Sequence, residues 1–340
     1  MFDKPLGTNY NGKVKDIFGK NRLQEKGETM IQIFMTEDGG IHQRDEVENG
    51  VWMALTDPTA TEILEISESY GIDPDHLRAP LDEEERSRIE LEDHYTLILV
   101  DIPAIEERSE KDWYVTIPLG IIVTEQMIIT ICLEETPILT AFMDGRVKEF
   151  YTYMKTRFIL QILYKNASMY LQYLRVIDKK SDVVERKLHK AQKNQELMEL
   201  LELEKSLLYF STSLRSNEVV LEKLMKTDKI KKYPEDTELL EDVIIENKQA
   251  IEMANIYSGN LNVTTEAVAS VISNNLNIVM KLLTTITLVM AIPTMIASFY
   301  GMNVLGIPFA THPEGFWIVI GFTVVLSLVV TLIFSKKDLF

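Results

Sequence analysis

The chain has 340 residues, of which 26% are charged and 46% hydrophobic, and its formal net charge is −17. This acidic balance argues against nucleic acid as a partner and for cations, because a negative field concentrates counter-ions, although plain solubility explains it equally well. The single cysteine, Cys132, excludes an intramolecular disulfide, and its apolar neighbours predict a core position.

The first part of the chain predicts a short lead-in and a mixed domain. Residues 1–29 are polar and without periodicity, so we expect a flexible lead-in and no secretory signal. Residues 30–148 predict a cytosolic α/β domain, whose strand order the pattern leaves open. The expected strands are Met30–Phe34, Val51–Leu55, Tyr95–Ile102, Tyr114–Thr124 and Met127–Leu133, and the expected helices are Thr59–Tyr70 and Pro74–Glu85.

Long helices are expected next. Residues 149–234 predict long antiparallel cytosolic helices, with turns at His189–Gln195 and Lys229–Pro234. Residues 235–300 predict a stalk helix that continues into the membrane and spans about 100 Å at 1.5 Å per residue. So long a helix cannot bury its apolar face alone, which predicts a homo-oligomer with a stalk.

Two segments near the C-terminus predict transmembrane helices. No Asp, Glu, Lys or Arg lies between Lys281 and Glu314, or between Glu314 and Lys336. The apolar stretches, about Leu282–Tyr300 and residues 316–334, each approach the ~20 residues that cross a bilayer.

The positions of the lysines predict the topology. Lys281 precedes the first span, Lys336 and Lys337 follow the second in a basic tail (335–340), and the loop at 301–315 has no Lys or Arg. The positive-inside rule therefore puts both termini in the cytoplasm of a multi-pass protein of the cell membrane, with the loop outside.

The loop begins with Tyr300-Gly-Met-Asn303, directly after the first span. Gly-Met-Asn at this place resembles the mark of the CorA family of divalent-cation channels, and Asn277-Ile-Val-Met-Lys-Leu-Leu283 is similar to a family run below it. The resemblance implies a funnel-shaped homopentamer, with an α+β cytosolic domain in α/β/α layers. It also implies import of hydrated Mg²⁺, and of Co²⁺ or Ni²⁺ as further substrates, with no organic cofactor and no enzymatic activity.

The chemistry of Gly301, Met302 and Asn303 fits a selectivity filter. Mg²⁺ sheds its water reluctantly, so a ring of Asn303 carboxamide and Gly301 backbone oxygens would bond to the hydrated ion, weakly enough for release. We expect Gly301 to allow a tight turn and close backbone approach. The alternative is that Gly301 and Asn303 only cap the helix.

One face of the first span predicts the pore lining. Small and hydroxyl residues share it, with Met280 and Leu283 as a constriction, although such residues also mediate helix packing in membranes. The candidate pore-lining residues are Asn277, Met280, Leu283, Thr287, Ala291, Thr294 and Ser298.

Acidic residues supply the remaining candidates. The resemblance implies that regulatory Mg²⁺ binds between neighbouring cytosolic domains, and Asp242 and Asp75 match the paired acids of that pattern, although both are otherwise ordinary solvated acids. Pro74 stands where the family has an acidic neighbour. Glu314, the one acid of the loop, is the candidate for attracting cations to the mouth.

Other interpretations stay open or are set aside. A Zn²⁺ transporter of the ZntB type shares this architecture, and a non-conducting, membrane-anchored sensor or scaffold fits the same two spans. The run Gly7–Lys13 has the spacing of a phosphate-binding loop, but Val14 replaces the required Ser or Thr. The five histidines show no paired spacing for zinc, although distant residues meet in folds.

Overall fold

The computed structural model describes residues 31–108, 111–191, 194–227, 233–304, 306–309 and 312–336. The expected lead-in and the Gly7–Lys13 run lie outside these residues, as does most of the basic tail. The elements, in chain order, are β1 (Ile31–Glu37), β2 (Gly40–Arg44), β3 (Trp52–Thr56), α2 (Ala60–Tyr70), α3 (Pro74–Arg78), the 3₁₀ turn η1 (Ala79–Leu81), β4 (Arg88–Leu91), β5 (Tyr95–Arg108), β6 (Lys111–Thr124), β7 (Ile128–Cys132), α4 (Pro137–Met143), α5 (Lys155–Ala191), α6 (Asn194–Lys226), α7 (Pro234–Tyr300) and α8 (Gly315–Lys336).

The chain divides inside α7 into two compact units. The first, here called the sheet unit, extends to Asn262, and the second, the C-terminal unit, begins at Val263. The expected boundary between the cytosolic helices and the stalk fell at residues 234/235, where α7 begins. The single helix α7 therefore belongs to both units.

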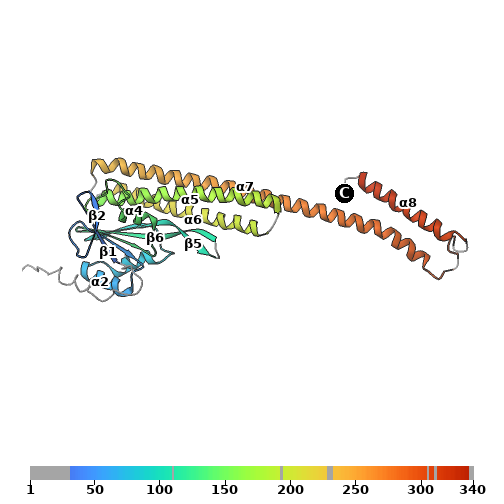
Figure 1. Cartoon of the computed structure of the whole chain (residues 1–340), viewed down its shortest axis with the longest axis horizontal. Coiled ribbons are helices and arrows are strands. Elements are labelled where there is room, and N and C mark those ends of the chain that lie inside the picture. The colour runs from blue at the N-terminus through green and yellow to red at the C-terminus, as the bar shows by residue number, and fades with distance from the viewer. Residues whose placement is uncertain are drawn as a thin grey trace, which may run out of the picture. The chain divides into compact units, whose positions relative to one another are not determined.

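The sheet unit is built on a seven-stranded sheet in the order β2-β1-β3-β7-β6-β5-β4. Only β3 and β7 pair in parallel, and all other neighbours are antiparallel. Figure 1 shows α4, α5 and α6 on one side of this sheet and α2 on the other. The expected order of layers, α/β/α, is confirmed.

Alternation along the strands gives the sheet two cores. In β5, Leu97 and Leu99 pack in the core below α2 and α3, whereas Ile98 and Val100 pack in the core below α4, α5 and α6. Side chains in a strand alternate between the faces, so a strand buried on both reads as a continuous apolar run. Cys132 lies in the core below α4, α5 and α6, and its buried position is as expected. Burial raises the pKa of its thiol to about 11.

Aromatic packing fixes the helix-covered face. The Trp52 ring lies edge-on to Phe142, Phe150 and Phe158 at centroid distances of 6.4, 6.2 and 5.0 Å. Its Nε1 donates a hydrogen bond of 2.8 Å to Thr130 Oγ1, so the one polar atom of the ring is satisfied in the core.

The first predicted helix is confirmed and the second is wrong in extent. Thr59 caps α2 through a reciprocal pair with Glu62, and Gly71 ends it in the left-handed conformation. The expected helix Pro74–Glu85 is instead α3 followed by η1. Pro80 lacks the N–H that a continuing α-helix needs, and the chain becomes extended at Asp82.

The turn η1 lies directly against β6. A Cβ added at Gly120 would sit 2.2 Å from Pro80 Cγ, a distance at which one of the two segments must move. Gly120→Ala is therefore expected to destabilise the protein by about 1–3 kcal/mol. The measurement is the thermal unfolding temperature of the full chain in detergent. Gly259→Ala is the control, because no atom lies within 4 Å of the added Cβ there. Equal unfolding temperatures for the two variants would contradict the contact.

Asn217 of α6 completes the edge of the sheet. Strand β4 pairs with β5 only as far as Leu99, so the backbone of Asp101 lies beyond the end of the ladder. Asp101 N donates to Asn217 Oδ1 at 2.9 Å, and Asn217 Nδ2 donates to Asp101 O at 2.7 Å. Ser87 Oγ also donates to Asn217 Oδ1 at 3.1 Å, and Asn166 Nδ2 donates to Asp101 O at 2.9 Å. The asparagine thus replaces the missing strand neighbour.

Candidate ion pathway

Two exposed apolar helices form the C-terminal unit. The most apolar part of α7 has a mean hydropathy of 1.9 and α8 one of 2.7, and only 6% and 0% of these stretches are buried. An apolar helix in the core of a soluble protein is buried on most sides, and these are not. Length, composition and exposure together fit two membrane spans.

The motif residues close the last turn of α7. Gly301 N donates to Ala297 O at 2.9 Å and Met302 N donates to Phe299 O at 3.3 Å. Both Met302 and Asn303 are exposed. The carboxamide of Asn303 is therefore free of the protein core, at the point where the helix ends.

The backbone at Gly301 does not show the expected tight turn. Its φ is not positive, and an added Cβ would meet Ala297 O at 3.4 Å, close to ordinary contact. A single chain therefore does not require glycine there. The loop requires it at Gly315, where an added Cβ would lie 2.1 Å from Phe309 O.

The face of α7 expected to line the pore is uncovered. Within the span, the partly or fully covered residues form a different stripe, namely Thr285, Val289, Ile292, Pro293 and Ile296. At 100° per residue the two stripes lie roughly on opposite sides of the helix. The exposed stripe contains all seven candidates, namely Asn277, Met280, Leu283, Thr287, Ala291, Thr294 and Ser298.

Hydroxyl groups on the exposed stripe donate to their own helix. Thr287 Oγ1 donates to Leu283 O at 2.8 Å, and Thr294 Oγ1 donates to Met290 O at 2.9 Å. The hydroxyl hydrogens are thereby used within the helix. The oxygen lone pairs remain available as acceptors.

The candidate acids lie on the surface. Asp75, in the first turn of α3, has a side chain 85% exposed and 3.4 Å from Arg78 Nη1. Asp242, on α7, and Glu314, just before α8, are also exposed. Within the described part of the chain, no hydrogen bond or ion pair joins Asp75 to Asp242.

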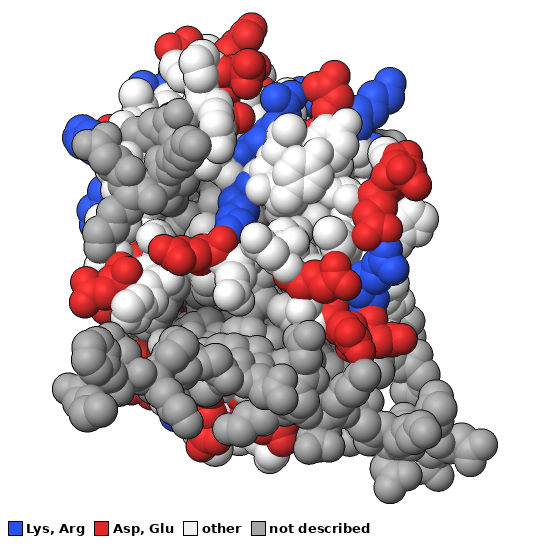
Figure 2. All heavy atoms as spheres, turned by 90° about the vertical axis from the view of Figure 1, so that its left-hand side faces the viewer, with Lys and Arg blue, Asp and Glu red and all other residues white. Residues whose placement is uncertain are grey.

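The acidic charge is dispersed on the face seen in Figure 2. Asp and Glu side chains form several separate groups around an uncharged area, with Lys and Arg between some of them. The net charge thus does not mark a single cation site on this face.

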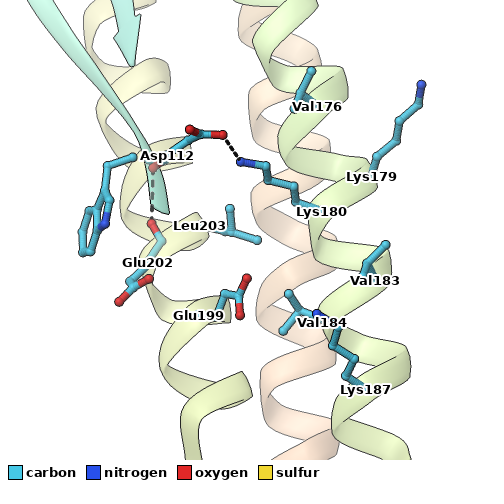
Figure 3. A pocket seen from close by; sticks show the side chains of 12 residues that line it. Asp112, Val176, Lys179, Lys180, Val183, Val184, Lys187, Glu199, Glu202 and Leu203 are labelled. Atoms are coloured by element: carbon cyan, nitrogen blue, oxygen red, sulfur yellow. Dashed lines mark hydrogen bonds and ion pairs between the residues drawn. The ribbon is translucent and has the colours of Figure 1, made fainter. Parts of the chain in front are cut away.

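A cavity of about 440 Å³ lies between α5, α6 and the start of β6. Lys179, Lys180 and Lys187 line it together with valines, and Lys180 Nζ points to Asp112 Oδ2 at 2.9 Å (Figure 3). Asp112, Glu199 and Glu202 also line the cavity, so its three lysines are balanced by three acids and its charge does not favour a cation.

The sequence profile described as CorA-like Mg²⁺ transporter protein matches residues 48–337. The chain belongs to the CorA family. It is 28% identical over 296 residues to the cobalt/magnesium transport protein CorA of Methanocaldococcus jannaschii, covering 84% of this chain and 90% of that protein. Membership places the chain among membrane transporters and channels, not enzymes.

Solved structures agree on the architecture. The complete CorA magnesium transporter of Methanocaldococcus jannaschii superposes with a TM-score of 0.79 at 25% identity, covering 93% of this chain and 100% of that one. The cytoplasmic domain of ZntB from Vibrio parahaemolyticus superposes with a TM-score of 0.57 at 10% identity, covering 72% of this chain and 98% of that one. The second likeness shows the fold alone.

Proposed function

We propose that the chain assembles as a homopentamer and imports hydrated Mg²⁺ across the cell membrane. The observation that carries this proposal is the position of Gly301, Met302 and Asn303 in a CorA-family chain, at the end of α7 and above an uncovered stripe. Both termini would lie in the cytoplasm, with Lys281 and Lys336 at the inner ends of the spans.

Asn303 would act as the entry ring for the hydrated ion. Its exposed carboxamide offers a neutral acceptor, and five copies would bond to the water shell of Mg²⁺ without removing it. Gly301 would bring its backbone oxygen close to the neighbouring copy. Close contact between the copies in this ring would explain why position 301 is a glycine, which a single chain does not require.

The uncovered stripe of α7 would line the pore below the ring. Thr287 and Thr294 would accept hydrogen bonds from the water carried with the ion, because their own hydrogens are bonded to the helix. Met280 and Leu283 would form the apolar constriction that closes by losing its water. Glu314 would attract cations at the outer mouth.

Asp242 and Asp75 would bind regulatory Mg²⁺ between neighbouring copies. Their exposure within one chain agrees with ligands that share an ion with a neighbouring copy. An ion present at ten times its dissociation constant stabilises the closed, ion-bound state by about 1.4 kcal/mol. Five equivalent sites therefore stabilise it by about 7 kcal/mol. A shift from mostly open to mostly closed needs about 5.5 kcal/mol, so weak sites suffice.

Replacing the proposed sensor residue is expected to weaken shut-off. Asp242→Asn should keep Mg²⁺ uptake into liposomes fast at high internal Mg²⁺, at least about fivefold above the parent, because each site loses a charged ligand. Glu241→Gln, the exposed neighbouring acid, is the control. Equal inhibition of Asp242→Asn and the parent would remove the sensor role.

The preferred ion is tested by competition. Uptake of Mg²⁺ into liposomes containing the full chain should be reduced by Co²⁺, the other ion in the name of the M. jannaschii relative. Preferential uptake of Zn²⁺, with Mg²⁺ unable to compete, would support the ZntB-type alternative instead.

A further inference from the structure

A histidine and two glutamates meet in the sheet unit. His76 lies on α3, Glu90 on the edge strand β4, and Glu92 just after that strand. One ligand atom from each, namely a ring nitrogen and two carboxylate oxygens, lies within 4.8 Å of the other two. Glu92 lies two residues after Glu90, just beyond Leu91, the last residue of the strand.

Tyr95 holds the imidazole in place. Its hydroxyl lies 2.8 Å from His76 Nδ1 and also accepts from Asp73 N at 3.1 Å. A hydrogen bond from Nδ1–H to this oxygen leaves the Nε2 lone pair directed at the glutamates. Metal-bound histidines usually have such a partner on the other ring nitrogen, because it fixes the tautomer and ring orientation.

The distances suit a small transition metal. His76 Nε2 lies 3.3 Å from Glu90 Oε2. Two ligands on a tetrahedral zinc ion, each with a bond of about 2.0–2.1 Å, are about 3.4 Å apart. A carboxylate oxygen of the exposed Glu92 lies within 4.8 Å of both ligand atoms and would supply the third ligand, and water would take the fourth position.

The charges around Glu90 and Glu92 favour the binding of a divalent cation. Arg88 Nε donates to Glu90 Oε1 at 2.5 Å, which fixes the carboxylate and leaves Oε2 directed at His76. Arg88 also pairs with Glu85. The three glutamates and one arginine have a formal charge of −2, equal and opposite to that of a divalent ion.

The donor set selects among divalent ions. Mg²⁺ prefers oxygen ligands only and keeps most of its water, whereas imidazole nitrogen favours Zn²⁺, Co²⁺ and Ni²⁺. We propose that His76, Glu90 and Glu92 form a binding site for a transition-metal ion of the Zn²⁺ class, separate from the ion pathway. All three protein ligands come from one chain, and the site does not depend on the proposed transport of Mg²⁺.

Zn²⁺ binding to the full chain in detergent tests this site. Calorimetry of the parent in excess Mg²⁺ should show one Zn²⁺ per chain that His76→Gln weakens by at least about tenfold. Glu92→Gln should weaken it in the same direction without touching the Tyr95 contact. His42→Gln removes an exposed histidine of β2 and is the matched control, with no expected change.

Co²⁺ supplies a second measurement. Its visible absorption reports nitrogen and carboxylate coordination, and the band should be lost in both site variants but not in His42→Gln. Unchanged Zn²⁺ affinity in His76→Gln and Glu92→Gln, or displacement of Zn²⁺ by Mg²⁺ at equal concentration, would overturn the proposal. None of these measurements depends on Mg²⁺ transport, so they test the metal site even if the transport proposal fails.

Discussion

Asn303→Ala is expected to abolish most Mg²⁺ uptake into liposomes. If five carboxamides each lose a hydrogen bond of about 0.5–1 kcal/mol to the hydrated ion, the entry barrier rises by at least about 2.5 kcal/mol. The initial rate then falls at least about fiftyfold. The side chain is exposed beyond the end of α7, so the fold should not change.

The control separates the filter from general damage. Asn262→Ala removes another exposed asparagine of α7, far along the chain from the motif, and should keep parental uptake. Parental uptake by Asn303→Ala itself would refute the channel proposal and favour the non-conducting anchor, in which the two spans only hold the protein at the membrane.

The second large effect is expected on stability. Asn217→Ala leaves the N–H of Asp101 without its partner and removes one of two bonds to its carbonyl. A buried group that loses its partner costs about 1–3 kcal/mol, so the two changes together cost about 2–4. The thermal unfolding temperature should fall by about 5–10 °C.

An exposed asparagine provides the comparison. Asn255 of α7 accepts bonds from Ser211 and Arg215 at 3.3 Å each, on the surface. Asn255→Ala should change stability by less than about 0.5 kcal/mol. If Asn217→Ala unfolds at the same temperature as Asn255→Ala, the side chain does not replace a strand neighbour.

The buried strands could be predicted from the sequence because their apolar runs are distinctive. Strand β7 lies within the expected run Met127–Leu133, and β3 differs by only one residue at each end from the expected Val51–Leu55. The pairing of β3 with β7 was left open, since no local signal joins two segments more than 70 residues apart.

The edge strands and a short helix could not be predicted. Strand β2 is mostly exposed and β4 is partly buried, both carry charged residues, and neither shows the alternation that marks a half-buried strand. Helix α4 has only seven residues, fewer than a periodic pattern needs. Without β4, no reasoning from spacing could place Glu90 beside His76.

The roles proposed for the motif and sensor residues depend on neighbouring copies of the chain. Gly301, Asn303, Asp75 and Asp242 are each exposed, and their proposed partners belong to other copies or to the ion. The sequence supplied these residues through a motif and a resemblance. The geometry adds that the proposed lining and the covered stripe of α7 are on opposite faces.

The internal bonds of Thr287 and Thr294 have a consequence for charge selection. A hydroxyl that donates its hydrogen to the helix has none to offer an anion. A pore lined by this face would solvate cations through lone pairs and leave chloride without donors from these threonines. Discrimination by sign would then arise from the direction of hydrogen bonds, without a charged residue in the membrane.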